Sequence, residues 1–426
     1  MRTRSILLSM TAVACASGGV NSSPPIEAGR PSASQTVSDR ALRIYRESYV
    51  VDAHNDMPSK MADDGYDADV RHPAGFGKQE GHTDLPRLME SGITAQFFSA
   101  FVDAPFALTS PDSSLERALQ LADTIHAFAD RHPDKLIFAT TAADVRRAKE
   151  SGKVAVMIGV EGGHAIENSL DNLRELHRRG VRYMTLTWNN GNQWSGAAWG
   201  VNGTSTGGLT PFGREVVREM NRLGMLVDIS HVSDSTFFDA IAATSQPVIA
   251  SHSSARALHE HRRNMSDEQL RAVAKNGGIV NVNFYSAFID RKYDAAVTAM
   301  EARLMSARDS LRLKYADDSS RVLDEVRMMR ASAFARLPPT PLAVLIDHID
   351  HIAKVAGVAH VGLGSDFDGV SALPEGMEDV THLPRIAQGL LDRGYSEDDV
   401  KKILGGNMMR VMGQVFDRRE APNGRE

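Results

Sequence analysis

The chain has 426 residues, of which 42% are hydrophobic, enough for one large domain or for a domain with a small satellite. Its 48 basic and 54 acidic residues give a formal net charge of -6, and the sequence has no basic patch of the kind that binds nucleic acid. The single cysteine excludes an internal disulfide and a thiolate metal cluster, so a bound metal would be held by histidines and carboxylates.

The chain begins like an exported protein. An apolar run over 6–13 follows two arginines and is too short to span a bilayer. Small residues then precede Cys15, as in a bacterial lipoprotein signal, and an ordinary secretion signal is the alternative. We therefore expect a signal peptide over 1–15, a flexible linker over 16–37, and a periplasmic or envelope-anchored protein for which a lipid on Cys15 would be the membrane tether.

The folded part is expected over 38–418, with a frayed tail over 419–426. Apolar, β-branched runs alternate there with amphipathic helical stretches. The predicted strands are 50–56, 92–101, 154–160, 181–187, 225–229, 247–250, 278–283 and 361–364. Such alternation favours a parallel sheet, and eight repeats favour a (β/α)8 TIM-like barrel. A doubly wound open sheet is the alternative, although no glycine-rich nucleotide fingerprint follows a strand.

Helices are predicted from Ser38, which can cap the first turn, to Tyr45, and also over 168–179, 211–223 and 266–275. The stretch 288–337 is long, charged and rich in Met and Arg, which predicts a helical insertion before the last strand. Its Met300, Leu304 and Met305 recur at helical spacing, and we assign this stripe to packing. Closing helices are expected over 379–415.

Residues with metal-binding chemistry stand at the C-terminal ends of these strands. The first strand ends in His54-Asn55-Asp56, and alternation along a strand puts its histidine and aspartate on one side. The later strand ends supply Glu161, His231, His252 and Asp366. Because the C-terminal end of a parallel barrel carries its chemistry, we expect these side chains to form one cluster.

Three imidazoles with two or three carboxylates suit zinc and tolerate manganese or cobalt. The set exceeds the roughly three protein ligands of a single catalytic zinc and suits two ions about 3.5–4 Å apart, with Glu161 as the bridging carboxylate. A water shared by two such ions becomes a nucleophile near neutral pH, which predicts hydrolysis. Asp366 is the candidate for proton transfer to a leaving amine, and Arg262-Arg263-Asn264 for binding a substrate carboxylate.

At this point the sequence resembles a known family, the membrane (renal-type) dipeptidases, which are binuclear zinc peptidases on a metal-dependent-hydrolase barrel. The resemblance covers about 49–412 and rests on VDAHNDMP, GVEGGHAIENSLDNLRELHRRGVRYMTLTW, VDISHVSD, HSSARALHEHRRNMSDEQL, VNFY and VGLGSDFDGV. It implies two Zn²⁺ per chain and a metal-bridging hydroxide that hydrolyses dipeptides, including those with a C-terminal D-residue. It also implies a homodimer.

The resemblance assigns the metal ligands position by position. It implies that His54 and Asp56 bind one zinc, and that His231 and His252 bind the second. Glu161 matches the carboxylate that bridges the two ions.

The resemblance also assigns residues that contact the substrate. Arg263 matches the residue that binds the substrate carboxylate, and Asp366 the acid that holds the substrate amine and assists proton transfer. Tyr285 lies in the matching substrate wall. One departure is Trp188, which follows Thr185-Leu186-Thr187 where mammalian members have a histidine that helps to stabilise the oxyanion. An indole offers a single uncharged donor, so the resemblance does not assign how the oxyanion is stabilised or which substrate side chain is preferred here.

Two alternatives to a dipeptidase follow from these observations. Trp188 motivates a related binuclear amidohydrolase that acts on a non-peptide amide, a lactam or an ester. The second alternative is a non-catalytic surface lipoprotein that keeps its metals as structural clamps. The presence of every expected ligand, and of Asp366, argues against the second.

Overall fold

The computed structural model describes residues 36–109, 113–199, 207–315, 319–334 and 336–416, which all belong to one unit, Ala33–Glu426. The expected signal peptide, Cys15, nearly all of the linker and the C-terminal tail lie outside the described residues. Among those that are described, no helix is both long and apolar enough to cross a membrane.

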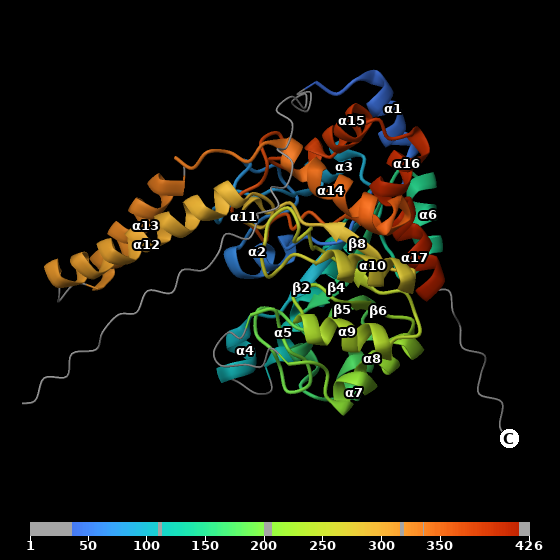
Figure 1. Cartoon of the computed structure of the whole chain (residues 1–426), viewed down its shortest axis with the longest axis horizontal. Coiled ribbons are helices and arrows are strands. Elements are labelled where there is room, and N and C mark those ends of the chain that lie inside the picture. The colour runs from blue at the N-terminus through green and yellow to red at the C-terminus, as the bar shows by residue number, and fades with distance from the viewer. Residues whose placement is uncertain (1–35, 110–112, 200–206, 316–318, 335, 417–426) are drawn as a thin grey trace, which may run out of the picture. The chain divides into compact units, whose positions relative to one another are not determined.

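The described residues form a closed barrel of eight parallel strands, because the strand Val154–Glu161, near one end of the sheet order, pairs back to Ala95–Phe101 at the other end. Figure 1 shows these strands at the centre with helices around them. The barrel strands are β1 (Val51–Asp52), β2 (Ala95–Phe101), β4 (Val154–Glu161), β5 (Val181–Thr185), β6 (Leu226–Asp228), β7 (Ile249–Ala250), β8 (Ile279–Val282) and β9 (Val361–Leu363). The predicted barrel is therefore confirmed, and the open-sheet alternative is wrong.

A short strand that the sequence pattern did not predict, β3 (Leu136–Phe138), pairs with the first residues of β4. Further along β4, β5 pairs instead, from Ile158 to Glu161. β3 is therefore an additional strand at the outside of the barrel and is not one of the eight strands that close it.

Helices follow the strands as the alternating pattern predicted. Those between the barrel strands are α2 (Met57–Asp64), α3 (Leu85–Ser91), α4 (Ala104–Thr109), α5 (Ser114–Arg131), α6 (Ala142–Glu150), α7 (Leu170–Arg178), α8 (Pro211–Leu223), α9 (Asp234–Ala243), α10 (Asp267–Asn276), α11 (Ser286–Ile289), α12 (Arg291–Lys314), α13 (Ser319–Phe334) and α14 (Leu342–Ala356). The chain opens with α1 (Asp39–Glu47) and closes with α15 (Pro384–Asp392), α16 (Glu397–Lys401) and α17 (Asn407–Phe416). Single turns occur at Gly163–Ile166, Val358–His360, Val380–His382 and Lys402–Gly406.

The helix boundaries follow capping chemistry in the sequence. The hydroxyl of Ser38 accepts from the backbone N–H of Ala41, as predicted for the first helix. Ser266 and Gln269 form a reciprocal capping box at the start of α10. α8 ends at Gly224, whose φ of 70° is a left-handed conformation that glycine adopts without strain.

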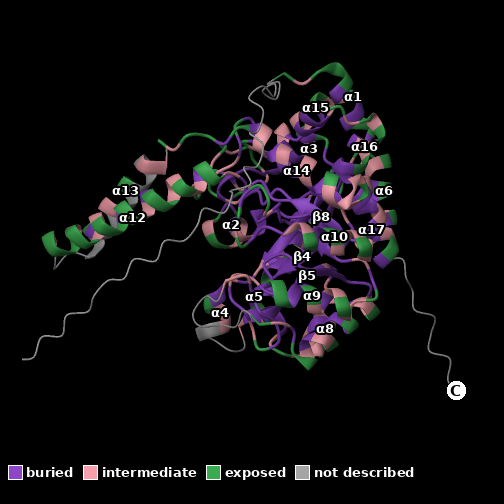
Figure 2. Ribbon diagram, in the orientation of Figure 1, coloured by how far each residue is buried: buried purple, intermediate pink, exposed green. Residues whose placement is uncertain are grey.

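The strands at the centre of the barrel are buried (Figure 2). Side chains on alternate positions of these strands divide the core into two layers: Phe98, Val156 and Met184 pack outward against the helices, whereas Phe97, Met157 and Tyr183 pack with each other inside the barrel. The inner cluster continues into side chains of α6 and α17. The barrel is thus a filled core, and its chemistry is confined to its C-terminal rim.

The insertion predicted before the last strand is present as α12 and α13, which lie side by side (Figure 1). Met300 and Leu304 are buried, as the packing interpretation of the stripe requires, but Met305 is 57% exposed. Met305 is adjacent to Leu304 in sequence, about 100° around the helix, and so turns away from the buried stripe.

We expect the substitution Gly159→Ala to destabilise the barrel. A Cβ at Gly159 would overlap the ring of Tyr183, which is itself fully buried. Overpacking of a core typically lowers the free energy of unfolding by about 1–3 kcal/mol, and this should appear as a lower urea midpoint. An unchanged midpoint would show that the Tyr183 ring has room to move aside.

Candidate metal centre and active site

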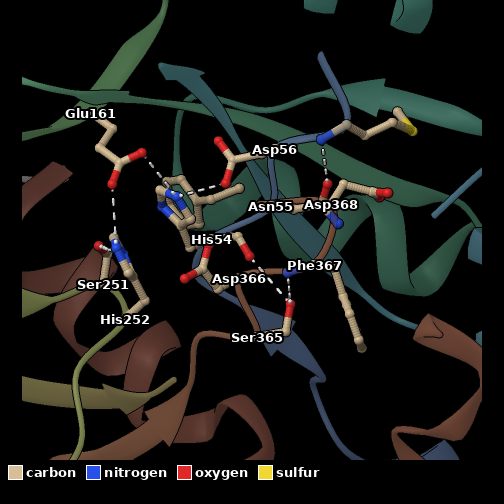
Figure 3. Close-up of polar contacts among 12 residues, drawn as sticks. His54, Asn55, Asp56, Glu161, Ser251, His252, Ser365, Asp366, Phe367 and Asp368 are labelled. Atoms are coloured by element: carbon tan, nitrogen blue, oxygen red, sulfur yellow. Dashed lines mark hydrogen bonds and ion pairs between the residues drawn. The ribbon is translucent and has the colours of Figure 1, made fainter. Parts of the chain in front are cut away.

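The ends of three strands converge on the carboxylate of Glu161, the last residue of β4, and Figure 3 shows this carboxylate facing His54 and His252. Its Oε1 lies 2.8 Å from Nε2 of His231, after β6, and 3.4 Å from Nε2 of His252, after β7. Its Oε2 lies 3.4 Å from Nε2 of His54, after β1. The same His54 nitrogen lies 3.3 Å from Oδ2 of Asp56. The structure therefore brings together the five residues that the sequence predicted as ligands.

Asp366, after β9, belongs to the same cluster. One group of potential ligand atoms, within 4.8 Å of one another, comes from His54, Glu161 and His252, and a second from His54, Asp56 and Asp366. Asn283, after β8, donates from Nδ2 to Oδ2 of Asp366 at 2.8 Å. All six predicted strand-end residues are thus neighbours at one rim, and all are buried.

The Nδ1 atoms of the three histidines each bond to a neighbouring oxygen. The phenol of Tyr183 donates to the carbonyl of Ala53, so it accepts from Nδ1 of His54, 2.8 Å away. The Ser251 hydroxyl donates to Oδ2 of Asp228 and likewise accepts from Nδ1 of His252 at 2.8 Å.

The third imidazole, His231, donates from Nδ1 to Oδ1 of Asn189 at 3.0 Å. In its neutral form, with the proton on Nδ1, each of the three rings presents a bare lone pair at Nε2. The Nε2 atoms of His231 and His252 lie 2.9 Å apart, and two lone pairs cannot hydrogen-bond to each other. Within the described part of the chain, Nε2 of His54 has no hydrogen-bond partner. A cation is the group that would satisfy all three nitrogens, and this donor set fits zinc.

Burial and neighbouring charges set the protonation of the cluster. Burial lowers the pKa of His231 to about 3, and Arg263 contributes to this shift, so the ring is neutral near pH 7. Burial opposes ionisation of Glu161, but the charge of His54 and the contacts with the other two imidazoles hold its pKa well below the usual range. Burial opposes protonation of His54, but Asp56 and Glu161 beside it hold its pKa well above the usual range, so this ring would release a proton on binding a metal. Glu161 as a carboxylate and His231 as a neutral imidazole already have the forms that bind metal.

Arg263 and Tyr285 lie on a shared aromatic neighbour beside the cluster. The Arg263 guanidinium is 5.4 Å from the centre of the Phe288 ring, and the Tyr285 ring meets the same ring edge-on at 4.8 Å. Arg263 donates to the carbonyl of His252 at 3.2 Å and is 3% exposed. Burial lowers its pKa to about 10, which still leaves it charged at neutral pH.

Trp188 lies at the rim near His231. Its ring is 6.4 Å from the imidazole of His231 and meets Phe101 edge-on at 4.9 Å. The residue is half-buried. The position where the resemblance expects a histidine thus holds an aromatic side chain beside a predicted metal ligand.

Sequence reasoning missed the residues that orient the cluster, namely Tyr183, Asn189, Asp228, Ser251 and Asn283. One signal was available, because a carboxylate inside an apolar strand, as in Met225–Ile229, marks a buried polar contact. The other four are uncharged and had no comparable signal.

The chain was compared with protein families and with solved structures. The family model for membrane dipeptidase (peptidase family M19) matches residues 38–425. Dipeptidase AC, a metallopeptidase of family M19, is 26% identical with a TM-score of 0.67, and the match covers 87% of this chain and 99% of that one.

Two further solved structures are similar in fold. The probable dipeptidase PvdM from Pseudomonas aeruginosa is 23% identical with a TM-score of 0.77, covering 89% of this chain and 98% of that one. A metallopeptidase from Rhodobacter sphaeroides, liganded with a phosphinate mimic of the dipeptide L-Ala-D-Ala, is 24% identical with a TM-score of 0.67, covering 86% and 99%. The family match spans nearly all of the folded part, and the chain belongs to the membrane dipeptidases of peptidase family M19.

Proposed function

We propose that this protein is a binuclear zinc dipeptidase that hydrolyses the single peptide bond of dipeptides, including those with a C-terminal D-residue. The observation that carries the proposal is the convergence of three bare imidazole nitrogens on the Glu161 carboxylate. The proposal that substrates with a C-terminal D-residue are accepted is supported by the Rhodobacter sphaeroides relative, which binds a mimic of L-Ala-D-Ala.

In this proposal the five clustered side chains hold two ions. His54 and Asp56 would hold one, His231 and His252 would hold the other, and Glu161 would be the shared ligand. Two bound divalent ions would lower the pKa of a water molecule and polarise the amide carbonyl. Zinc is the preferred ion, and manganese or cobalt would be tolerated by the same nitrogen and oxygen donors.

Asp366 is the proposed acid–base group. It is the carboxylate of the cluster that is not assigned to a metal. Asn283 donates a hydrogen bond to its Oδ2, and the carboxylate lies beside His54 and Asp56. From there it would hold the substrate ammonium group, take the proton from the attacking water and deliver it to the leaving nitrogen.

Arg263 is the proposed partner of the substrate carboxylate. Its Nε has no hydrogen-bond partner among the described residues, although the side chain is buried. A substrate carboxylate would satisfy this donor with a charge-assisted hydrogen bond. Tyr285, on the other edge of Phe288, would form part of the wall that the substrate packs against.

A second candidate keeps the same metal chemistry with a different substrate. Trp188 presents an uncharged aromatic surface 6.4 Å from His231, which favours an apolar group at this position. A binuclear amidohydrolase acting on a non-peptide amide, a lactam or an ester would use the same cluster.

We also propose that the protein is exported, that Cys15 carries its lipid anchor and that it forms a homodimer. The first two rest on the signal-like sequence before Cys15, and the third on the resemblance to the dipeptidase family. Mass spectrometry of the mature N-terminus would detect a diacylglyceryl cysteine, and light scattering would give the subunit number.

We expect Tyr183→Phe to weaken zinc binding by about 10–100-fold, the usual effect of removing an outer partner of a metal-binding histidine. The variant keeps the ring but removes the acceptor that holds the Nδ1 proton of His54. Zinc affinity would be measured by competition with a chromophoric chelator.

Tyr45→Phe is the matched control, because the Tyr45 hydroxyl is buried in α1 and has no hydrogen-bond partner among the described residues. Its zinc affinity should equal that of the wild type. Equal affinities in all three proteins would contradict the role assigned to Tyr183.

We expect dialysed protein to cleave L-Ala-L-Ala and L-Ala-D-Ala only after zinc is added, with release of alanine as the readout. Asp366→Asn should lower kcat by about 10²–10⁴-fold while the zinc content is unchanged, because the amide cannot carry the proton. A zinc-loaded wild type that left both dipeptides intact would contradict the dipeptidase proposal. Faster turnover of a lactam or an ester than of any dipeptide would favour the second candidate.

A further inference from the structure

Two hydrogen bonds join the loop after β9 to a segment that precedes α3. The backbone N–H of His82 donates to Oδ1 of Asp368 at 2.8 Å, and the backbone N–H of Asp368 donates to Nδ1 of His82 at 2.9 Å. Both residues are buried. Because Nδ1 accepts, the His82 ring must be neutral, and burial lowers its pKa to about 3, which keeps it so.

The next residue, Thr83, holds a second loop. The side chain of Asn55 donates from Nδ2 to the Thr83 hydroxyl at 2.7 Å, while its Oδ1 accepts from the backbone N–H of Met57. Asn55 stands between the predicted ligands His54 and Asp56. Two consecutive residues therefore hold the loops that end β1 and β9, and Figure 3 shows Asn55 and Asp368 next to each other.

The loop after β9 has a backbone that needs support. Asp366 and Asp368 have φ values of 64° and 65°, a left-handed conformation that residues other than glycine rarely adopt. Between them, the carbonyl of Phe367 accepts from the backbone N–H of Asp56 at 2.8 Å. A Cβ at Gly369 would overlap the carboxylates of Asp56 and Asp366, so the turn is closely packed against both. A shift of this turn would move Asp366 relative to Asp56.

The 82–83 segment is itself fixed to the scaffold. Asp84 caps α3 by accepting from the backbone N–H of Arg87, and its Oδ2 pairs with Nε of Arg87 at 2.8 Å. The same guanidinium donates to the carbonyl of Gly81 at 2.7 Å. This ion pair is almost completely buried, and it therefore anchors both sides of His82 and Thr83.

We propose that His82 and Thr83 are positioning residues, which hold Asp366 in place against the His54-Asn55-Asp56 loop. The inference rests on the proposed function, in which Asp366 transfers the proton. Neither residue touches the substrate; they act through Asp368 and Asn55. The prediction is that loss of the His82 acceptor lowers the rate of the chemical step more than it weakens substrate binding.

The test compares His82→Ala with His82→Asn. Alanine removes the acceptor for the Asp368 N–H, whereas asparagine places an amide oxygen close to where Nδ1 was. In zinc-saturated enzyme we expect His82→Ala to lower kcat for L-Ala-D-Ala by about 10–100-fold, with KM changed by less than about threefold. His82→Asn should recover at least about tenfold of that loss.

His360→Ala is the matched control, because His360 also hydrogen-bonds a backbone group, the carbonyl of Gly278, but stands just before β9 at the far end of the strand from Asp366. Its kcat and KM should match those of the wild type. A His82→Ala enzyme with wild-type kcat, or a His82→Asn enzyme no better than His82→Ala, would overturn the proposal.

Hydrogen exchange supplies a readout that does not depend on catalysis. The amide of Asp368 should exchange at least about tenfold faster in His82→Ala than in the wild type, and His82→Asn should restore its protection. A wild type that cleaves no dipeptide would overturn the proposed function, and exchange would still decide whether the hydrogen bonds hold the turn. Unchanged exchange of Asp368 in His82→Ala would overturn the inference whatever the substrate.

Discussion

The contact between the Glu161 carboxylate and three imidazoles is the constraint on which the site depends. An ionised carboxylate buried at this depth needs compensating positive charge or donors. The three rings that face it are held with Nδ1 protonated, by Tyr183, Asn189 and Ser251, and in their neutral forms they offer lone pairs instead of N–H donors. Cations between the carboxylate and the nitrogens would satisfy the whole set, which links the fold of the rim to metal binding.

Closure of the barrel explains why the sequence could predict both the strands and the cluster. Each buried parallel strand leaves an apolar run, and the first polar residues after it lie on the same rim as those of every other strand. Glu161 illustrates this, since it pairs in register with Phe101 of β2 and Thr185 of β5. The six strand-end residues could therefore be grouped without any knowledge of distances.

The residues that orient the cluster could not be predicted in the same way. Tyr183 is 129 residues from His54 in the sequence, and its hydroxyl reaches the imidazole only because closure of the barrel brings the two strands to face each other. The left-handed backbone of His231 and Asp366, with φ of 65° and 64°, is likewise imposed by packing. β3 escaped prediction because three residues are too few to show a period.

The same pair of hydrogen bonds, from a serine to an aspartate on the neighbouring strand, occurs twice at the rim and joins the candidate metal-binding loops to the barrel. Asp52, the last residue of β1, accepts from the backbone N–H and the hydroxyl of Ser365, at 2.7 and 2.6 Å. Asp228, the last residue of β6, accepts from the same two groups of Ser251, at 2.8 and 2.6 Å.

Each of these serines follows a neighbouring strand and stands immediately before a residue of the cluster, Asp366 or His252. The two buried aspartates therefore fix the starting points of both loops across strand boundaries. Because a misplacement of about 1 Å in a catalytic group can cost about 100-fold in rate, these cross-strand bonds bear directly on the rate of the proposed reaction. The strands of the barrel thus position the rim, and these hydrogen bonds set where the two loops begin.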